Sequence, residues 1–168
     1  MLRQLLDRYR SKFDLVEALQ IRSSIKEFFR SIPISLEPDL HGEGRYSSNG
    51  GLQMIAKVDA DDRPILLHEL LHALHFDKLP NGRQNSDIMI FYERAKGIGS
   101  YPKDAYMLKN AAEFFAMTAS AYLHGSVARP PYSREALMRA QPIYAQYLGR
   151  LFGSEPAPAS VSGSSELH

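Results

Sequence analysis

The chain has 168 residues, a length that suits one domain with a sizeable hydrophobic core. Its 20 basic and 19 acidic residues leave a formal net charge of +1, so the overall charge gives no case for binding nucleic acid or an anionic membrane. The absence of cysteine excludes disulfides, cysteine-ligated zinc, iron–sulfur clusters and a thiol nucleophile.

No apolar run in the sequence is long enough to span a membrane. The N-terminal stretch MLRQLLDRYR is too charged for the core of a signal peptide. We therefore expect a protein that is either cytoplasmic or secreted without a visible signal peptide. We also expect it to be a monomer.

The first part of the chain is predicted to form a helix followed by a small sheet. Apolar residues recur at three- and four-residue steps over residues 2–30, which is typical of a helix packed on a core. Pro33 ends this helix, and residues 32–37 alternate apolar and polar side chains as an edge strand does. Residues 45–47 and 52–58 flank a glycine-containing turn, which indicates a β-hairpin. A small mixed sheet of three or four strands is therefore expected.

Two further helices are predicted after the H-E-x-x-H region described below. The first covers residues 87–96, with Asn85 or Ser86 as its cap. The second covers residues 105–124 and ends at Gly125. This second helix is expected to pack on the core through one face.

The C-terminal part is predicted to contain a connector, a last helical region and a tail. Pro130-Pro131-Tyr132 indicates a rigid extended connector, after which Ser133 caps a helical region to Phe152 that Pro142 interrupts. From residue 154 the composition turns to Ser, Ala, Pro and Gly, so residues 154–168 are predicted to be a disordered tail. The pattern as a whole predicts an α+β fold with a single domain over residues 1–153.

The segment HELLH at residues 68–72 matches the pattern H-E-x-x-H of zinc peptidase helices. His68 and His72 are four positions apart and lie on one face of an α-helix, so both imidazoles can reach a single metal ion. Glu69 lies about 100° around the helix axis from His68. From there it can act as a general base without binding the metal.

The helix that carries this motif is expected to be buried, because leucines occupy more than one of its sides. Asp61 or Asp62 is a suitable N-cap and Pro64 suits the first turn, so the helix is expected to begin just before the motif. Buried histidine and glutamate side chains need partners, which a metal ion supplies. The alternative is a core helix whose motif is accidental, with two satisfied histidines and a salt-bridged glutamate.

Zinc needs a third protein ligand, and Glu113 is the strongest candidate. It is a lone carboxylate on a helix face of alanine and phenylalanine, where an unpaired carboxylate is costly. Lys109, four residues earlier, could instead hold it in an ordinary surface pair. Glu93 is the second candidate ligand, although the basic residues beside it indicate a solvated helix end.

His75 shares a helix face with His68 and His72 but is not expected to bind the same ion. Positions 68 and 75 are separated by about 10 Å along a straight helix, whereas zinc ligands lie about 2 Å from the metal. We expect His75 either to support the ligands or line the pocket, or to be an ordinary surface histidine.

The combination of His68-Glu69-x-x-His72, Tyr106 and Glu113-Phe114-Phe115-Ala116 resembles the gluzincin peptidases related to the catalytic domain of anthrax lethal factor. The same combination is also similar to the Pro-Pro endopeptidases and the MtfA-type peptidases. The resemblance covers about residues 32–152. The resemblance implies a zincin-like (gluzincin) domain whose helical C-terminal subdomain carries the third ligand, Glu113. It also implies that Tyr106 stabilises the oxyanion, a role for which Tyr101 is the competing residue.

Two positions depart from the lethal factor pattern. Met117 stands where that pattern has an acidic residue, and His75 stands where it has an aspartate. Both positions are next to ligands in the pattern, so the departures bear on metal affinity and optimum pH more than on the ligand set.

From these residues we expect a zinc-dependent metalloendopeptidase. His68, His72 and Glu113 would hold Zn²⁺, Glu69 would act as the general base, and Tyr106 would donate to the oxyanion. In peptidases of this type an edge strand pairs with an extended substrate, so the expected partner is a peptide or protein. The alternative is a catalytically silent zinc-binding domain with a regulatory or toxin-like role. The loops expected to line the cleft are Ser47–Gly51, Gly97–Tyr101 and Pro130–Tyr132.

Overall fold

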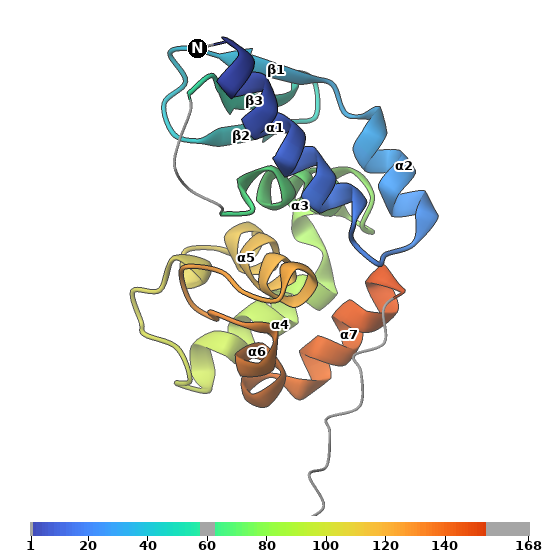
Figure 1. The fold of residues 1–168 in the computed structure, drawn as a ribbon. Helices are drawn as coiled ribbons and strands as arrows, with labels where there is room; N and C mark the ends of the chain where they lie inside the picture. Colours follow the sequence, from blue (N-terminus) through green and yellow to red (C-terminus); the bar gives the residue numbers. More distant parts are fainter. Residues whose placement is uncertain (1, 58–62, 154–168) are drawn as a thin grey trace, which may run out of the picture.

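The computed structural model describes residues 2–57 and 63–153, and these form an α+β fold with seven α-helices and a three-stranded sheet (Figure 1). The α+β class predicted from the sequence is confirmed. The helices are α1 (Leu2–Glu17), α2 (Ser23–Ser31), α3 (Ile65–Asp77), α4 (Ser86–Gly97), α5 (Ala111–His124), α6 (Arg134–Ala140) and α7 (Pro142–Phe152). The strands are β1 (Ile34–Glu37), β2 (Gly44–Ser47) and β3 (Gly51–Ile55), and short 3-10 turns cover Gly82–Gln84 and Tyr106–Leu108. Within the described ranges, every helix is too short or too polar to cross a membrane.

The sheet is mixed, as predicted, and its strand order is β1-β3-β2. β1 runs parallel to β3 and is an edge strand, which the alternation over residues 32–37 predicts. β2 and β3 form the predicted antiparallel hairpin, and Gly51 at its turn has a φ of 71° that favours glycine. β2 is the other edge and packs more extensively against α3 than β3 does. The open edge next to α3 therefore belongs to β2.

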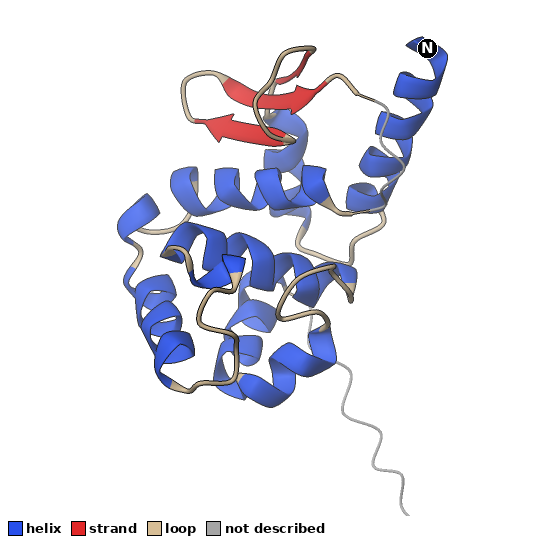
Figure 2. Ribbon diagram, turned by 90° about the vertical axis from the view of Figure 1, so that its left-hand side faces the viewer, coloured by secondary structure: helices blue, strands red, loops and turns tan. Residues whose placement is uncertain are grey.

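Helix α3 lies between the sheet and the helices α4–α7, as two perpendicular views show (Figure 1, Figure 2). A helix that is apolar on more than one side requires burial on both sides. The predicted start just before the motif is confirmed, since α3 begins at Ile65. The predicted cap is wrong, because Pro64 is the N-cap instead of a first-turn residue, and Asp61 and Asp62 lie outside the described residues. Its buried leucines are Leu66, Leu67, Leu70, Leu71 and Leu74.

The prediction of one continuous helix over residues 2–30 is wrong. α1 ends at Glu17 and α2 begins at Ser23 as a separate helix, because hydrogen bonds to the end of α7 hold Arg22 between them. The backbone N–H of Arg22 donates to the carbonyl of Phe152 at 2.8 Å. The guanidinium of Arg22 donates to the carbonyls of Arg150 at 2.8 Å and Leu151 at 3.2 Å. Contacts from the far end of the sequence thus override the local periodicity.

The helix boundaries in the C-terminal half follow the predicted capping residues. Asn85 caps α4, because its side-chain oxygen accepts a hydrogen bond from the N–H of Ile88 at 3.0 Å. Gly125 ends α5 with a φ of 98°. Ser133 caps α6, and the predicted interruption at Pro142 separates α6 from α7.

Two predictions in this half are corrected. Residues 105–110 do not belong to α5, because the side chain of Asn110 accepts a hydrogen bond from the N–H of Glu113 and starts the helix at Ala111. The connector at residues 130–132 is not extended, because the N–H of Val127 donates to the carbonyl of Tyr132 and closes a loop. The predicted tail, residues 154–168, lies outside the described residues.

Candidate metal centre

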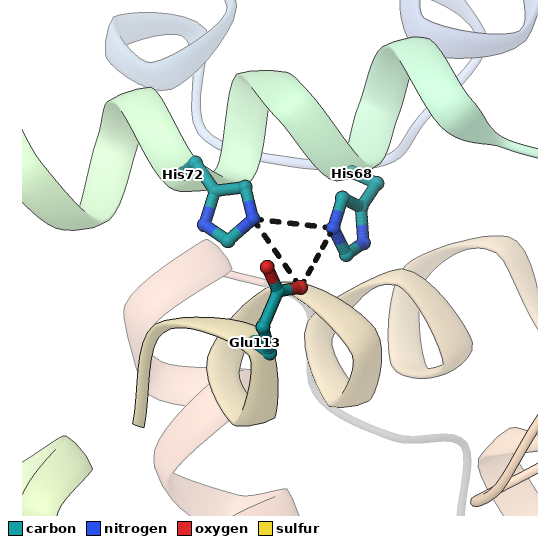
Figure 3. Close-up of side chains that lie close together, drawn as sticks. All are labelled: His68, His72 and Glu113. Atoms are coloured by element: carbon teal, nitrogen blue, oxygen red, sulfur yellow. Dashed lines mark hydrogen bonds and ion pairs between the residues drawn. The ribbon is translucent and has the colours of Figure 1, made fainter. Parts of the chain in front are cut away.

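Two histidines of α3 and one glutamate of α5 converge on one point (Figure 3). His68 Nε2 and His72 Nε2 lie 3.2 Å apart, and Glu113 Oε2 lies 3.2 Å from the first and 3.5 Å from the second. The four-residue spacing places both rings on the face of α3 that meets α5. Because Asn110 fixes the start of α5, Glu113 falls in the first turn of that helix, opposite the histidines. The three predicted ligands are thus brought together.

These three atoms have the spacing of ligands around one metal ion. Ligands about 2.1 Å from a tetrahedral ion lie about 3.4 Å from one another, close to the observed distances of 3.2 and 3.5 Å. His72 Nδ1 is buried and has no hydrogen-bond partner in the described part of the chain, and the buried Glu113 Oε2 has only the two imidazole nitrogens beside it. Within residues 2–57 and 63–153, this is the one group of three such side chains that could hold a metal ion.

The Glu113 carboxylate is held in its ionised form. Burial raises the pKa of Glu113, but the imidazoles of His68 and His72 outweigh this effect and hold the pKa well below its usual range. The alternative pairing with Lys109 is not the one observed, since Lys109 Nζ lies over the ring of Tyr106, 5.6 Å from its centroid. Glu93 forms an exposed ion pair with Lys96 at 3.3 Å, so the second candidate ligand stays outside the site.

Glu69 lies beside the ligands and is buried, with 8% of its surface exposed. Burial raises the pKa of its carboxyl group, and the charges of His68 and His72 oppose part of that rise. A carboxylate with a raised pKa is a stronger proton acceptor once it is ionised. A Cβ on Gly44 would lie 2.7 Å from Glu69 Cγ, so only glycine lets the edge strand β2 approach this closely. Glu69 is therefore enclosed between its own helix and the start of β2.

The structure separates the two candidate tyrosines. Tyr106 lines the cleft together with His68 and Glu113, and burial and then the Glu113 carboxylate raise its pKa. The hydroxyl of Tyr101 instead donates to Gln141 Oε1 at 3.0 Å and does not line the cleft, and burial raises its pKa to about 12. Tyr106 is therefore the tyrosine placed to reach a molecule bound at the three ligands.

The site opens into a cleft of about 600 Å³ on one side and a recess of about 300 Å³ on the other. The loops predicted to line the cleft line neither space, and this prediction is wrong. The hairpin turn is tied back because Tyr46 and Ser48 both donate to the carboxylate of Asp77 at the end of α3. The walls are formed instead by residues 44–46 of β2 beside the cleft and by residues 127–129 beside the recess, which Met117 also lines.

Comparison with known proteins gives no relative for this chain: no family model, no curated protein and no solved structure matches it. The chemistry of His68, His72 and Glu113, with Glu69 and Tyr106 beside them, is therefore what points to a function. These five side chains come from α3, α5 and the 3-10 turn before α5.

His75 lies neither at the pocket wall nor at the surface, and within the described ranges it makes no hydrogen bond that could support a predicted ligand. It is completely buried, with its ring centroid 5.3 Å from that of Phe115 and 5.3 Å from that of Phe76. Neither ring nitrogen has a hydrogen-bond partner among the described residues, and the side chain lines neither the cleft nor the recess. Burial, with smaller effects from His72 and Arg83, lowers its pKa to about 4. His75 is therefore a neutral core residue.

This burial predicts a stability change in acid. The pKa of His75 is about 4 in the folded protein against an ordinary value of 6.5, so between these values only the unfolded chain binds the proton. The free energy of unfolding therefore falls as the pH drops through this window, by roughly 3 kcal/mol in total. His75→Leu should remove that loss. Denaturant titrations of both proteins should show a difference that is constant above pH 6.5 and grows toward pH 4.

The matched control is His41→Leu, because His41 is exposed. This variant should keep the acid sensitivity of the wild type. A His75→Leu protein that lost stability over the same pH window as the wild type would show that another group causes the effect.

Proposed function

We propose that this protein is a zinc-dependent metalloendopeptidase of the gluzincin type with a zincin-like fold. The observation that carries the proposal is the convergence of His68 Nε2, His72 Nε2 and Glu113 Oε2 within 3.5 Å of one another. The position of Glu69 and Tyr106 beside them, at a cleft, supports a hydrolytic role rather than a structural metal site. The resemblance to the lethal factor group in these same five residues supports the same conclusion.

Zinc is the metal that this donor set favours. Two imidazoles and one carboxylate are the protein ligands of zinc peptidases, and three protein ligands leave one position for water or substrate. When bound, zinc polarises the scissile carbonyl and lowers the pKa of water to near neutrality. A structural zinc site would instead use four protein ligands.

The chain's own residues supply the proton transfers. The Glu69 carboxylate accepts a proton from the attacking water and then donates it to the leaving amine. Burial beside Gly44 raises the pKa of the Glu69 carboxyl group. The group can then both accept the proton and return it near neutral pH. The hydroxyl of Tyr106 donates a hydrogen bond to the oxyanion that forms on the substrate carbonyl.

The edge strand β2 is placed to hold an extended substrate. The N–H of Ile55 donates to the carbonyl of Glu43 at 3.1 Å, and pairs in an antiparallel ladder alternate between bonded and non-bonded. The backbone groups of Gly44 and Tyr46 therefore point away from β3, toward the open edge that lines the cleft. A peptide that pairs with this edge would pass directly over Glu69.

Peptide digestion with and without a chelator tests this function. Purified protein loaded with zinc should cleave members of a mixed peptide library. A chelator should stop the cleavage, and added zinc should restore it. Bound zinc without cleavage of any peptide would instead identify a catalytically silent binding domain.

Replacement of Tyr106 by phenylalanine should lower kcat for peptide hydrolysis about 10²-fold, because one hydrogen-bond donor to the oxyanion is lost. KM and the zinc content should change little. The matched control is Tyr101→Phe, which removes a hydroxyl bonded to Gln141 outside the cleft and should leave kcat unchanged. Equal losses in the two variants would remove Tyr106 from the mechanism.

A further inference from the structure

Five cationic side chains line the two openings of the site; Arg63 pairs with Glu43, and the other four have no carboxylate partner among the described residues. Arg45, Arg83 and Lys109 line the cleft, and Arg129 lines the recess. None of the four makes an ion pair with a carboxylate of the described residues, in contrast to Arg30, which pairs with Glu17. Their charges are therefore available to a bound molecule.

Three of these cations are held by aromatic rings that adjoin the metal ligands. Arg83 Cζ lies 3.6 Å from the ring centroid of Phe76, and Phe76 stacks on His72 with a centroid distance of 5.5 Å. Lys109 Nζ and Arg129 Cζ lie 5.6 and 5.1 Å from the ring centroid of Tyr106. Cation–π contacts position a cation without neutralising it, so its N–H groups remain able to bind an anion. Arg45, the fourth, donates to the neutral side chain of Gln53.

The carboxylates in the same walls do not balance this charge. Glu43 pairs with Arg63, Glu113 contacts the two imidazoles, and Glu69 is buried. The walls are thus positively charged although the chain as a whole carries a net charge of only +1. A cleft lined by one sign of charge raises the local concentration of oppositely charged ligands.

We propose that the substrate is an acidic peptide, bound in extended form along β2, with aspartate or glutamate side chains on both sides of the cleaved bond. This substrate class presupposes the peptidase function proposed above. Arg45, Arg83 and Lys109 would bind acidic side chains on the cleft side, and Arg129 would bind one on the recess side. The open edge of β2 supplies the backbone pairing that an extended peptide requires.

A peptide fits this surface better than a single-stranded nucleic acid, which would also be anionic. Nucleic acid binding in grooves depends on exposed aromatic rings on which bases stack. Here the ring of Phe76 lies between Arg83 and His72, and the ring of Tyr106 is flanked by Lys109 and Arg129. These two rings already support cations, and of the other aromatic side chains that line the cleft, Tyr92 is buried and Tyr46 donates to Asp77.

The test compares peptide pools of equal length that share a randomised uncharged centre and differ in their flanks, which are acidic in one pool and basic in the other. The zinc-loaded protein should cleave the acidic pool with a kcat/KM about tenfold higher, and added salt should reduce this preference. The double variant Arg83→Gln/Arg129→Gln should lower kcat/KM for the acidic pool about tenfold, at roughly threefold per charge.

The matched control is Arg10→Gln/Arg94→Gln, which removes two exposed side chains that line neither opening. It should leave kcat/KM unchanged for the acidic pool and for the basic pool. Thermal melting of each variant establishes that it is folded. Equal cleavage of the pools, or a preference for the basic pool, would overturn the substrate class while the peptidase function stands.

If the wild type cleaves neither pool, binding of the same pools to zinc-loaded Glu69→Gln protein separates the peptidase function from the acidic-peptide surface. Tighter binding of the acidic pool without any cleavage by the wild type would support the acidic-peptide surface and refute the peptidase function. Equal binding of the pools would refute the surface. A single-stranded DNA oligomer that bound more tightly than the acidic pool would also overturn the peptide assignment.

Discussion

Glu69→Gln should lower kcat for peptide hydrolysis about 10³-fold while the zinc content stays at that of the wild type. The substitution keeps the size of the buried side chain but removes the group that accepts and returns the proton. Glu69 is not one of the three converging ligands, so the metal should remain bound. Initial rates on one peptide, together with metal analysis of the same samples, measure both quantities.

The control for this substitution is Glu93→Gln, which removes an exposed carboxylate paired with Lys96 on α4. It should leave both kcat and zinc content unchanged. A Glu69→Gln protein that cleaved the peptide at the wild-type rate would show that another group acts as the base.

Glu113→Ala should weaken zinc binding by more than about 100-fold, a larger effect than removing a group that only supports a ligand. In the proposed site the carboxylate is the one ligand from α5, so without it the two imidazoles of α3 would hold the ion alone. Peptide hydrolysis should be lost with the metal. Competition with a chelator of known affinity, followed by metal analysis, gives the dissociation constants of both proteins.

Glu93→Ala is the matched control, because Glu93 is a helical glutamate outside the site, and it should bind zinc as the wild type does. Retention of one zinc per chain by Glu113→Ala under conditions that leave the wild type loaded would remove Glu113 from the ligand set. Another group would then have to complete the site.

The convergence of His68, His72 and Glu113 could be predicted because the signals for it are local. The four-residue spacing of His68 and His72 places both rings on one helix face, and an isolated carboxylate among alanine and phenylalanine needs a cation. The approach of Glu113 to within 3.5 Å of both rings follows from the packing of α5 on α3. The capping signals of Asn85, Gly125 and Ser133 were equally local, and the structure has helix ends at each of them.

The features that were not predicted depend on contacts between distant parts of the chain. The break between α1 and α2 requires hydrogen bonds from Arg22 to carbonyls at residues 150–152. The close approach of Gly44 to Glu69 exists only after the sheet packs on α3, so no local pattern around Gly44 predicts it. The expectation that His75 supports the ligands, lines the pocket or lies at the surface fails because a polar residue in the core without a hydrogen bond contradicts the usual rule.

The cations around the site were also not predicted, for a related reason. The net charge of +1 is an average over the chain and carries no information on where the charges gather. Arg83 and Arg129 are separated by 46 positions, and the fold brings them to the cleft and the recess, which share His68 in their linings. A charge pattern of this kind emerges only from the tertiary structure.

The most direct test of the metal centre is a crystal structure of the zinc-loaded protein with anomalous data collected at the zinc absorption edge. We expect one peak per chain, about 2.0–2.2 Å from Nε2 of His68, Nε2 of His72 and a carboxylate oxygen of Glu113. A zinc peak elsewhere, or no peak with the Glu113 carboxylate turned away from both rings, would contradict the proposed centre and the peptidase function that depends on it.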